Sequence, residues 1–110
     1  MALPNASHAI IDPRKLTSHA LNPGHPIGGN KARVFQSVLG FTARDAALLV
    51  ERIQSGVLEN PASRGVTNVH GTLYTVDIPI TGPNGSGVIR TAWIVEPGAM
   101  GPRLITLYVK

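Results

Sequence analysis

A histidine and two cationic side chains lie close together in the chain, around the point where a helix is expected to begin. His25 is flanked by two prolines, whose rings restrict the backbone and can hold the imidazole in place. Asn30 favours a helix start, which puts Lys31 and Arg33 in the first turn. The helix dipole disfavours cations there, so this placement indicates a bound anion; the alternative is that both side chains extend into water. Nearby cations favour the neutral form of His25, which can act as a base near pH 7.

Further polar side chains follow in the second half of the chain, where the sequence has the alternating pattern of β-strands. Arg90 and Thr91 are neighbours, so their side chains must point to opposite faces of a strand. Only one of them can therefore belong to a site on a given face, and the sequence leaves open which one. In the last strand, Leu104, Thr106 and Tyr108 are expected to share a face.

Other kinds of active site are disfavoured. The chain has no cysteine, which excludes disulfides, thiolate metal sites and a cysteine nucleophile. Its four histidines have neither the spacing of a helical zinc site nor a neighbouring carboxylate. The glycine-rich segment 82–87 lacks the Gly-Lys-Ser/Thr ending of a phosphate-binding P-loop. We therefore expect neither a metal ion nor a cofactor.

Composition indicates one small globular domain with an anionic partner. A chain of 110 residues is long enough for a single hydrophobic core, so residues 1–110 are expected to form one domain, with residues 1–14 as a linker-like or poorly ordered segment. Ten Lys and Arg against six Asp and Glu give a net charge of +4, and seven of the cations are Arg. Arginine suits phosphate, so nucleic acid is the leading candidate partner, followed by an acidic protein surface. Ordinary solubilising charge is the alternative.

No membrane-spanning segment is expected. The longest wholly apolar run is Ala46 to Val50, which is far too short to cross a bilayer. The N-terminus also lacks the basic and then apolar pattern of a signal peptide.

Two helices are expected ahead of the strands. Asn30 can cap the first helix. The apolar side chains of this helix recur with a helical period up to Gly40, a residue that typically terminates helices. The stretch from Thr42 to Asp45 resembles a capping box and opens a second helix, which is expected to end at Gly56.

Four strands are expected after the helices, at residues 64–69, 73–80, 88–96 and 103–109. They are separated by turn-forming residues, most clearly at Gly82–Gly87. Helices followed by a run of strands predict an α+β fold, with N-terminal helices packed on one face of a four-stranded antiparallel β-meander. We expect the functional residues on the other face, and Trp93 in the core.

The sequence resembles a family of small prokaryotic domains. The resemblance covers Lys15 to Val109 and rests on Leu-Asn-Pro-x-His-Pro-x-Gly-x-x-Lys-Ala-Arg-Val-Phe at 21–35, Leu-Gly-Phe at 39–41, Arg-Thr-Ala-Trp-Ile-Val at 90–95 and Pro-Arg-Leu-x-Thr-x-Tyr at 102–108. Members of that family occur alone and at the C-terminal tips of large toxins, including contact-dependent growth inhibition proteins. Similar toxin tips belong to the barnase, EndoU and RelE group of metal-independent ribonucleases.

The resemblance implies that this domain cleaves RNA, with transfer RNA as the substrate class. Cleavage without a metal ion needs a base for the 2′-hydroxyl proton, an acid for the leaving oxygen and cations around the phosphate. The implied catalytic residues are His25, Lys31, Arg90, Thr106 and Tyr108, and the implied RNA-binding residues are Arg33, Thr91 and Arg103.

A toxin of this kind implies a neutralising partner, an acidic immunity or antitoxin protein. It would act in the bacterial cytoplasm and be delivered as the C-terminal part of a larger secreted or cell-surface protein. The alternative is a non-catalytic module of a toxin–antitoxin pair that binds RNA or a protein partner, which the basic charge fits equally well.

Overall fold

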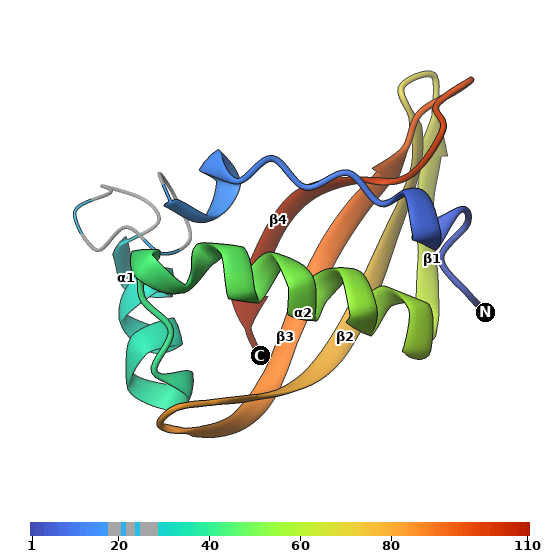
Figure 1. Ribbon diagram of the computed structural model, residues 1–110. Coiled ribbons are helices and arrows are strands. Elements are labelled where there is room, and N and C mark those ends of the chain that lie inside the picture. The colour runs from blue at the N-terminus through green and yellow to red at the C-terminus, as the bar shows by residue number, and fades with distance from the viewer. Residues whose placement is uncertain (18–20, 22–23, 25–28) are drawn as a thin grey trace.

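The second half of the chain forms a four-stranded sheet. The computed structural model describes residues 1–17, 21, 24 and 29–110. Its strands are β1 (Ala62–Asn68), β2 (Gly71–Gly82), β3 (Gly85–Val95) and β4 (Arg103–Val109). They pair in the order β1-β2-β3-β4, each antiparallel to the next (Figure 1). The expected α+β fold with an antiparallel meander is therefore confirmed.

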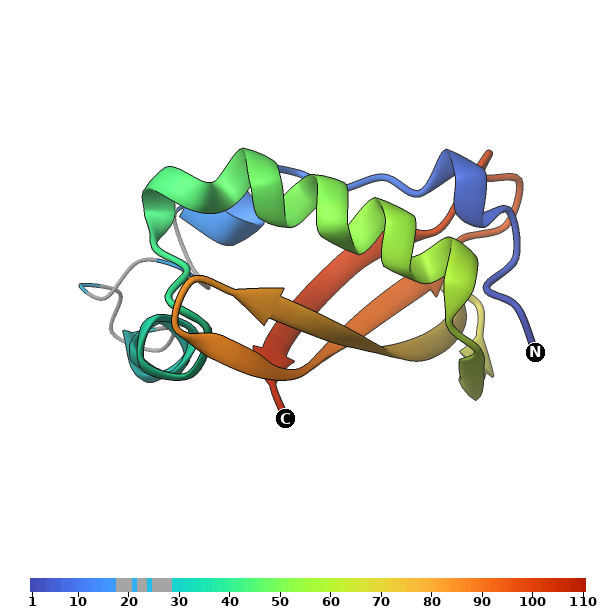
Figure 2. The same cartoon turned by 60° about the horizontal axis from the view of Figure 1, so that its bottom comes forward.

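One face of the sheet packs against the helix α2 (Ala46–Glu59), as Figure 2 shows. Alternate side chains of β2, from Tyr74 to Ile80, are buried on this face, because a strand directs every second side chain to the same side. They meet the apolar stripe of α2, which includes Ile53 and Val57. We call the opposite side, where the side chains of β2–β4 are half-buried or exposed, the open face.

The start of α2 follows the sequence prediction and its end does not. The backbone N–H of Thr42 donates to Oδ2 of Asp45 at 2.9 Å, which confirms the capping box. The helix continues past Gly56 to Glu59, three residues beyond the expected end. A Cβ on Gly56 would come within 2.5 Å of Ile78 Cγ2. Gly56 therefore lets the helix approach β2 closely and does not terminate it.

The first predicted helix is divided into α1 (Gly29–Val34) and a π-helical turn, η3 (Phe35–Leu39). It ends as expected at Gly40, which has the left-handed φ of 82° that glycine tolerates best. Asn84, in the turn between β2 and β3, donates its backbone N–H to Leu39 O at 3.0 Å and its side-chain amide to Gln36 O at 3.2 Å. These bonds satisfy carbonyls at the helix end and attach η3, which continues from α1, to the β2–β3 turn (Figure 2).

The N-terminal segment packs along the domain and differs from the linker-like segment expected from the sequence. Leu3 is only 2% exposed and belongs to the core. Ile10 donates its N–H to Pro102 O at 2.8 Å and accepts from Leu104 N–H at 3.0 Å. The segment is therefore held by one buried apolar side chain and by backbone bonds at the edge of β4, although its sequence has no periodic pattern. No helix in the described residues is long and apolar enough to cross a membrane.

Candidate functional site

The strand register gathers polar side chains on the open face. The two-residue turn between β2 and β3 pairs Asp77 with Arg90. On the next strand Tyr108 lies opposite Arg90, and Thr106 lies opposite Ala92. Directly paired residues of an antiparallel sheet point to the same side. Arg90, Thr106 and Tyr108, which lie far apart in the sequence, therefore share one surface.

A β-bulge changes which residues of β4 share a face. The pairing shifts between Ala92, which faces Thr106, and Trp93, which faces Leu104, so β4 has one extra residue at this point. Leu104 consequently points into the core, where it is 1% exposed. The prediction that Leu104 shares a face with Thr106 is wrong, because strict alternation does not allow for a bulge.

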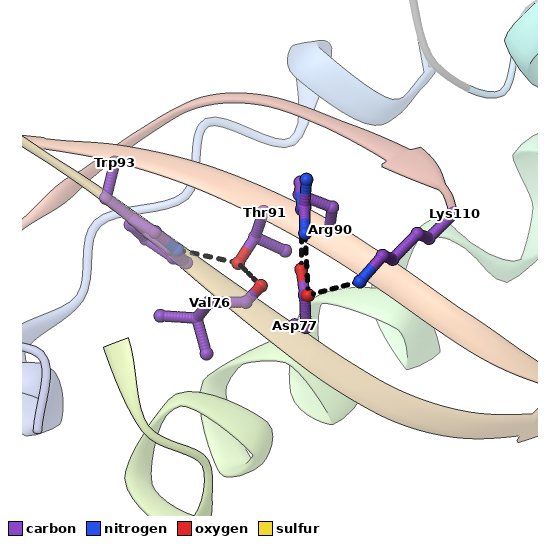
Figure 3. A network of polar contacts seen from close by, with 6 residues as sticks. All are labelled: Val76, Asp77, Arg90, Thr91, Trp93 and Lys110. Carbon is purple, nitrogen blue, oxygen red and sulfur yellow. Dashed lines mark hydrogen bonds and ion pairs between the residues drawn. The ribbon is translucent and has the colours of Figure 1, made fainter. Parts of the chain in front are cut away.

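Thr91 lies on the core side of β3, opposite the face of Arg90. Its hydroxyl donates to Val76 O at 2.8 Å and accepts from the indole Nε1 of Trp93 at 2.8 Å (Figure 3). Thr91 and Trp93 are both fully buried, which confirms the core position expected for Trp93. The structure therefore places Thr91 in the core and not on the open face with Arg90. Its hydroxyl satisfies the buried indole N–H of Trp93, which would otherwise carry a desolvation cost.

Lys31 reaches the open face from α1. Its Nζ donates to Thr106 Oγ1 at 2.9 Å, across 75 positions of sequence. The same ammonium lies 5.9 Å from the centre of the Tyr108 ring, within the range of a cation–π contact. Because Thr106 accepts from Lys31, its own O–H can still be donated to a ligand.

Arg90 is held by Asp77, a residue that sequence analysis did not single out. Arg90 Nε and Nη2 donate to the two carboxylate oxygens at 2.8 and 2.9 Å. Lys110 Nζ also approaches Asp77 Oδ2, at 3.1 Å (Figure 3). The bidentate pair fixes the plane of the guanidinium. The third guanidinium nitrogen, Nη1, takes no part in the pair with Asp77. The alternation of β2 offered a signal, because the only acidic side chain of that strand stands at an open-face position.

These contacts set the charge states of the pair. The hydrogen bonds from Arg90, and then the nearby Lys110, lower the pKa of Asp77 to about 2 against the opposing effect of burial. The carboxylate of Asp77, and next the hydroxyl of Tyr108, raise the pKa of Arg90. Arg90 therefore stays protonated and can act on a substrate only as a cation and hydrogen-bond donor.

The lowered pKa of Asp77 predicts acid sensitivity. A carboxylate with a lower pKa in the folded than in the unfolded chain adds stability that is complete above about pH 4 and is lost as the pH falls towards 2. We expect wild type to exceed Asp77→Asn in melting temperature at pH 6, and the difference to shrink towards pH 2. The difference should be modest because the Asp77 side chain is 35% exposed. Glu51→Gln, on the exposed side of α2, is the control, and equal pH profiles for Asp77→Asn and wild type would contradict the assignment.

We call Lys31, Arg90, Thr106 and Tyr108 the cation–hydroxyl cluster. The remaining predicted site residues lie outside this cluster. Arg103 is exposed at the start of β4 and donates from Nε to Glu96 Oε1 at 3.0 Å. Arg33 occupies an exposed position on α1, and His25 lies outside the described residues. Within the described part of the chain, no group of three or more His, Asp or Glu side chains is arranged to hold a metal ion.

Comparisons with known proteins identify a family and a fold. The chain belongs to the family described as Domain of unknown function (DUF6883), whose model matches residues 2–110. A search of curated proteins found no match. Among solved structures, a chain of a contact-dependent growth inhibition toxin–immunity protein complex from Klebsiella pneumoniae 342 is similar, with a TM-score of 0.64 and 17% sequence identity. The match covers 92% of this chain and 99% of that chain. At this level of identity, the comparison establishes a shared fold.

Proposed function

We propose that this domain is a metal-independent ribonuclease toxin that cleaves RNA, with transfer RNA as its substrate class. The observation that carries the proposal is the cation–hydroxyl cluster, which joins α1 to the open face through the bond between Lys31 and Thr106. Two cations and two hydroxyls on one accessible surface are suited to a phosphodiester. The fold shared with a chain of a toxin–immunity complex supports the toxin assignment, and the net charge of +4 supports an anionic substrate.

The proposed reaction transfers the phosphoryl group to the neighbouring 2′-oxygen. His25 takes the 2′-hydroxyl proton, the 2′-oxygen attacks phosphorus, and the bond to the 5′-oxygen breaks. Tyr108 donates a proton to that leaving oxygen, and the products are a 2′,3′-cyclic phosphate and a 5′-hydroxyl. Arg90, Lys31 and the O–H of Thr106 stabilise the charge that builds up on the phosphoryl oxygens.

The proposal is tested by incubating purified domain with total RNA and with transfer RNA in the presence of EDTA. We expect cleavage, and fragments that end in 2′,3′-cyclic phosphate, because the cluster supplies protons and positive charge without a metal ion. End analysis with a phosphatase that acts on open phosphates but not on cyclic ones distinguishes the product. A strict need for Mg²⁺ or Zn²⁺ would exclude this mechanism, and RNA binding without cleavage would favour the non-catalytic binding module instead.

The same proposal includes a partner and a place of action. An acidic immunity protein that covers the cluster would exclude RNA and be attracted by the charges that attract the substrate. The domain would act in the cytoplasm of a target bacterium, delivered as the C-terminal part of a larger secreted or cell-surface protein. We expect the association rate of the two proteins to fall as the salt concentration rises, because salt screens the attraction between charged surfaces.

A further inference from the structure

A small pocket lies beside the cation–hydroxyl cluster, between α1 and the end of β4. It has a volume of about 280 Å³, and the described residues that line it are Lys31, Val34, Tyr108 and Val109. The wall is almost wholly apolar and is made by two valines, Tyr108 and Lys31, whose ammonium group is bonded to Thr106. Val34 and Tyr108 are 40% and 37% exposed, so a ligand can reach both surfaces.

The pocket is continuous with the proposed phosphate site. Lys31 and Tyr108 belong to both, since Lys31 Nζ bonds Thr106 at 2.9 Å and lies 5.9 Å from the Tyr108 ring centre. An occupant of the pocket would therefore be within a few bonds of an anion held by Lys31 and Arg90. A larger hollow of about 500 Å³ lies between the N-terminal segment and α2, but no residue of the cluster lines it.

We infer that this pocket binds the base of a nucleotide adjoining the scissile phosphate, an inference that rests on the proposed function. A nucleobase is flat and has a π face, which stacks on an aromatic side chain and packs against aliphatic walls. It is also joined through its sugar to a phosphate, which the neighbouring cations complement. The size of the pocket suits one planar ring system better than an extended chain.

The inference assigns separate roles to the two parts of Tyr108. Its hydroxyl serves the leaving oxygen, whereas its ring forms a wall of the pocket. Val34, which the sequence analysis did not single out, becomes a substrate-binding residue through its position one helical turn beyond Lys31. Side chains three residues apart on a helix lie on the same side, which is why Lys31 and Val34 can face one pocket.

The test compares Val34→Asn with Val38→Asn in the full domain. Both valines lie at the surface of the same helical segment, with 40% and 39% exposure, but Val38 does not line the pocket. The substrates are an oligoribonucleotide spanning the mapped cleavage site and two versions of it that lack the base on the 5′ or the 3′ side of the scissile bond. Circular dichroism confirms that each variant is folded.

We expect Val34→Asn to lower kcat/KM on the intact substrate by roughly tenfold, the lower end of what one apolar contact in a substrate pocket contributes, and Val38→Asn to stay within about twofold. On one of the two abasic substrates, wild type and Val34→Asn should have equal kcat/KM, because that substrate lacks the base that would contact the pocket. Equal losses on all three substrates would overturn the inference, as would an unchanged Val34→Asn.

The failure of this inference can be distinguished from the failure of the proposed function. If wild type cleaves no RNA, the proposed function fails, and fluorescence anisotropy then compares binding of a short single-stranded oligoribonucleotide with that of the same strand lacking its bases. A wild-type preference for the intact strand that Val34→Asn removes would still identify a base pocket, and no preference would overturn it. If Val34→Asn weakens binding of an acidic immunity protein but leaves RNA binding and cleavage unchanged, the base pocket is overturned and Val34 instead contacts the partner protein.

Discussion

Arg90→Ala is expected to lower the rate of RNA cleavage by about 100- to 1000-fold and to abolish toxicity on induction in a sensitive bacterium. Losing a preorganised donor aimed at developing negative charge typically costs this much. The Asp77 carboxylate would keep its bond from Lys110 at 3.1 Å, so removing Arg90 does not leave it without a cation. Arg90→Lys should recover only part of the activity, because an ammonium keeps the charge but not the bidentate fork.

Arg52→Ala is the matched control for this experiment. Arg52 lies on α2, away from the open face, and donates from Nη1 to Thr81 O at a long 3.4 Å. Its removal changes the net charge by the same amount and should leave cleavage within about threefold of wild type, as is usual for a cation remote from the site. If the two alanine variants lose equal activity, general electrostatic attraction explains the effect and Arg90 has no specific role.

The second large effect concerns stability and the N-terminal segment. Leu3→Ala is expected to lower the free energy of unfolding by about 2–4 kcal/mol, since deleting a buried leucine side chain removes transfer free energy and leaves a cavity. Leu3 is 2% exposed and packs in the main core. Chemical denaturation with urea, followed by tryptophan fluorescence of the buried Trp93, measures the loss.

Leu58→Ala is the control, because it makes the same chemical change on α2 at a position that is 61% exposed. We expect it to change the unfolding free energy by less than about 0.5 kcal/mol. A Leu3→Ala variant as stable as Leu58→Ala would show that the N-terminal segment adds no stability and behaves as the linker predicted from composition.

The sequence alone predicted the elements that depend on local patterns. Three local features were predicted correctly: the alternation in β2, the capping box at Thr42 and Asp45, and the helix end at Gly40. Each is decided by residues within a few positions of one another. The run of helices followed by strands was sufficient for the α+β class. The core position of Trp93 followed from its size and apolar surface.

The candidate site was predictable in part. Lys31, Arg90, Thr106 and Tyr108 were chosen by residue type and by resemblance, and the structure brings these four together. His25 lies outside the described residues, and its catalytic role remains a prediction.

Tertiary structure alone decided which side chains share a surface. Neighbouring strand residues must face opposite ways, but only the register and the packing of α2 put Arg90 on the open face and Thr91 in the core. The bulge in β4 then separated Leu104 from Thr106. The contact of Lys31 with Thr106, across 75 positions, depends on the docking of the β2–β3 turn on η3. Long-range contacts of this kind arise from the packing of whole elements, so no local sequence pattern encodes them.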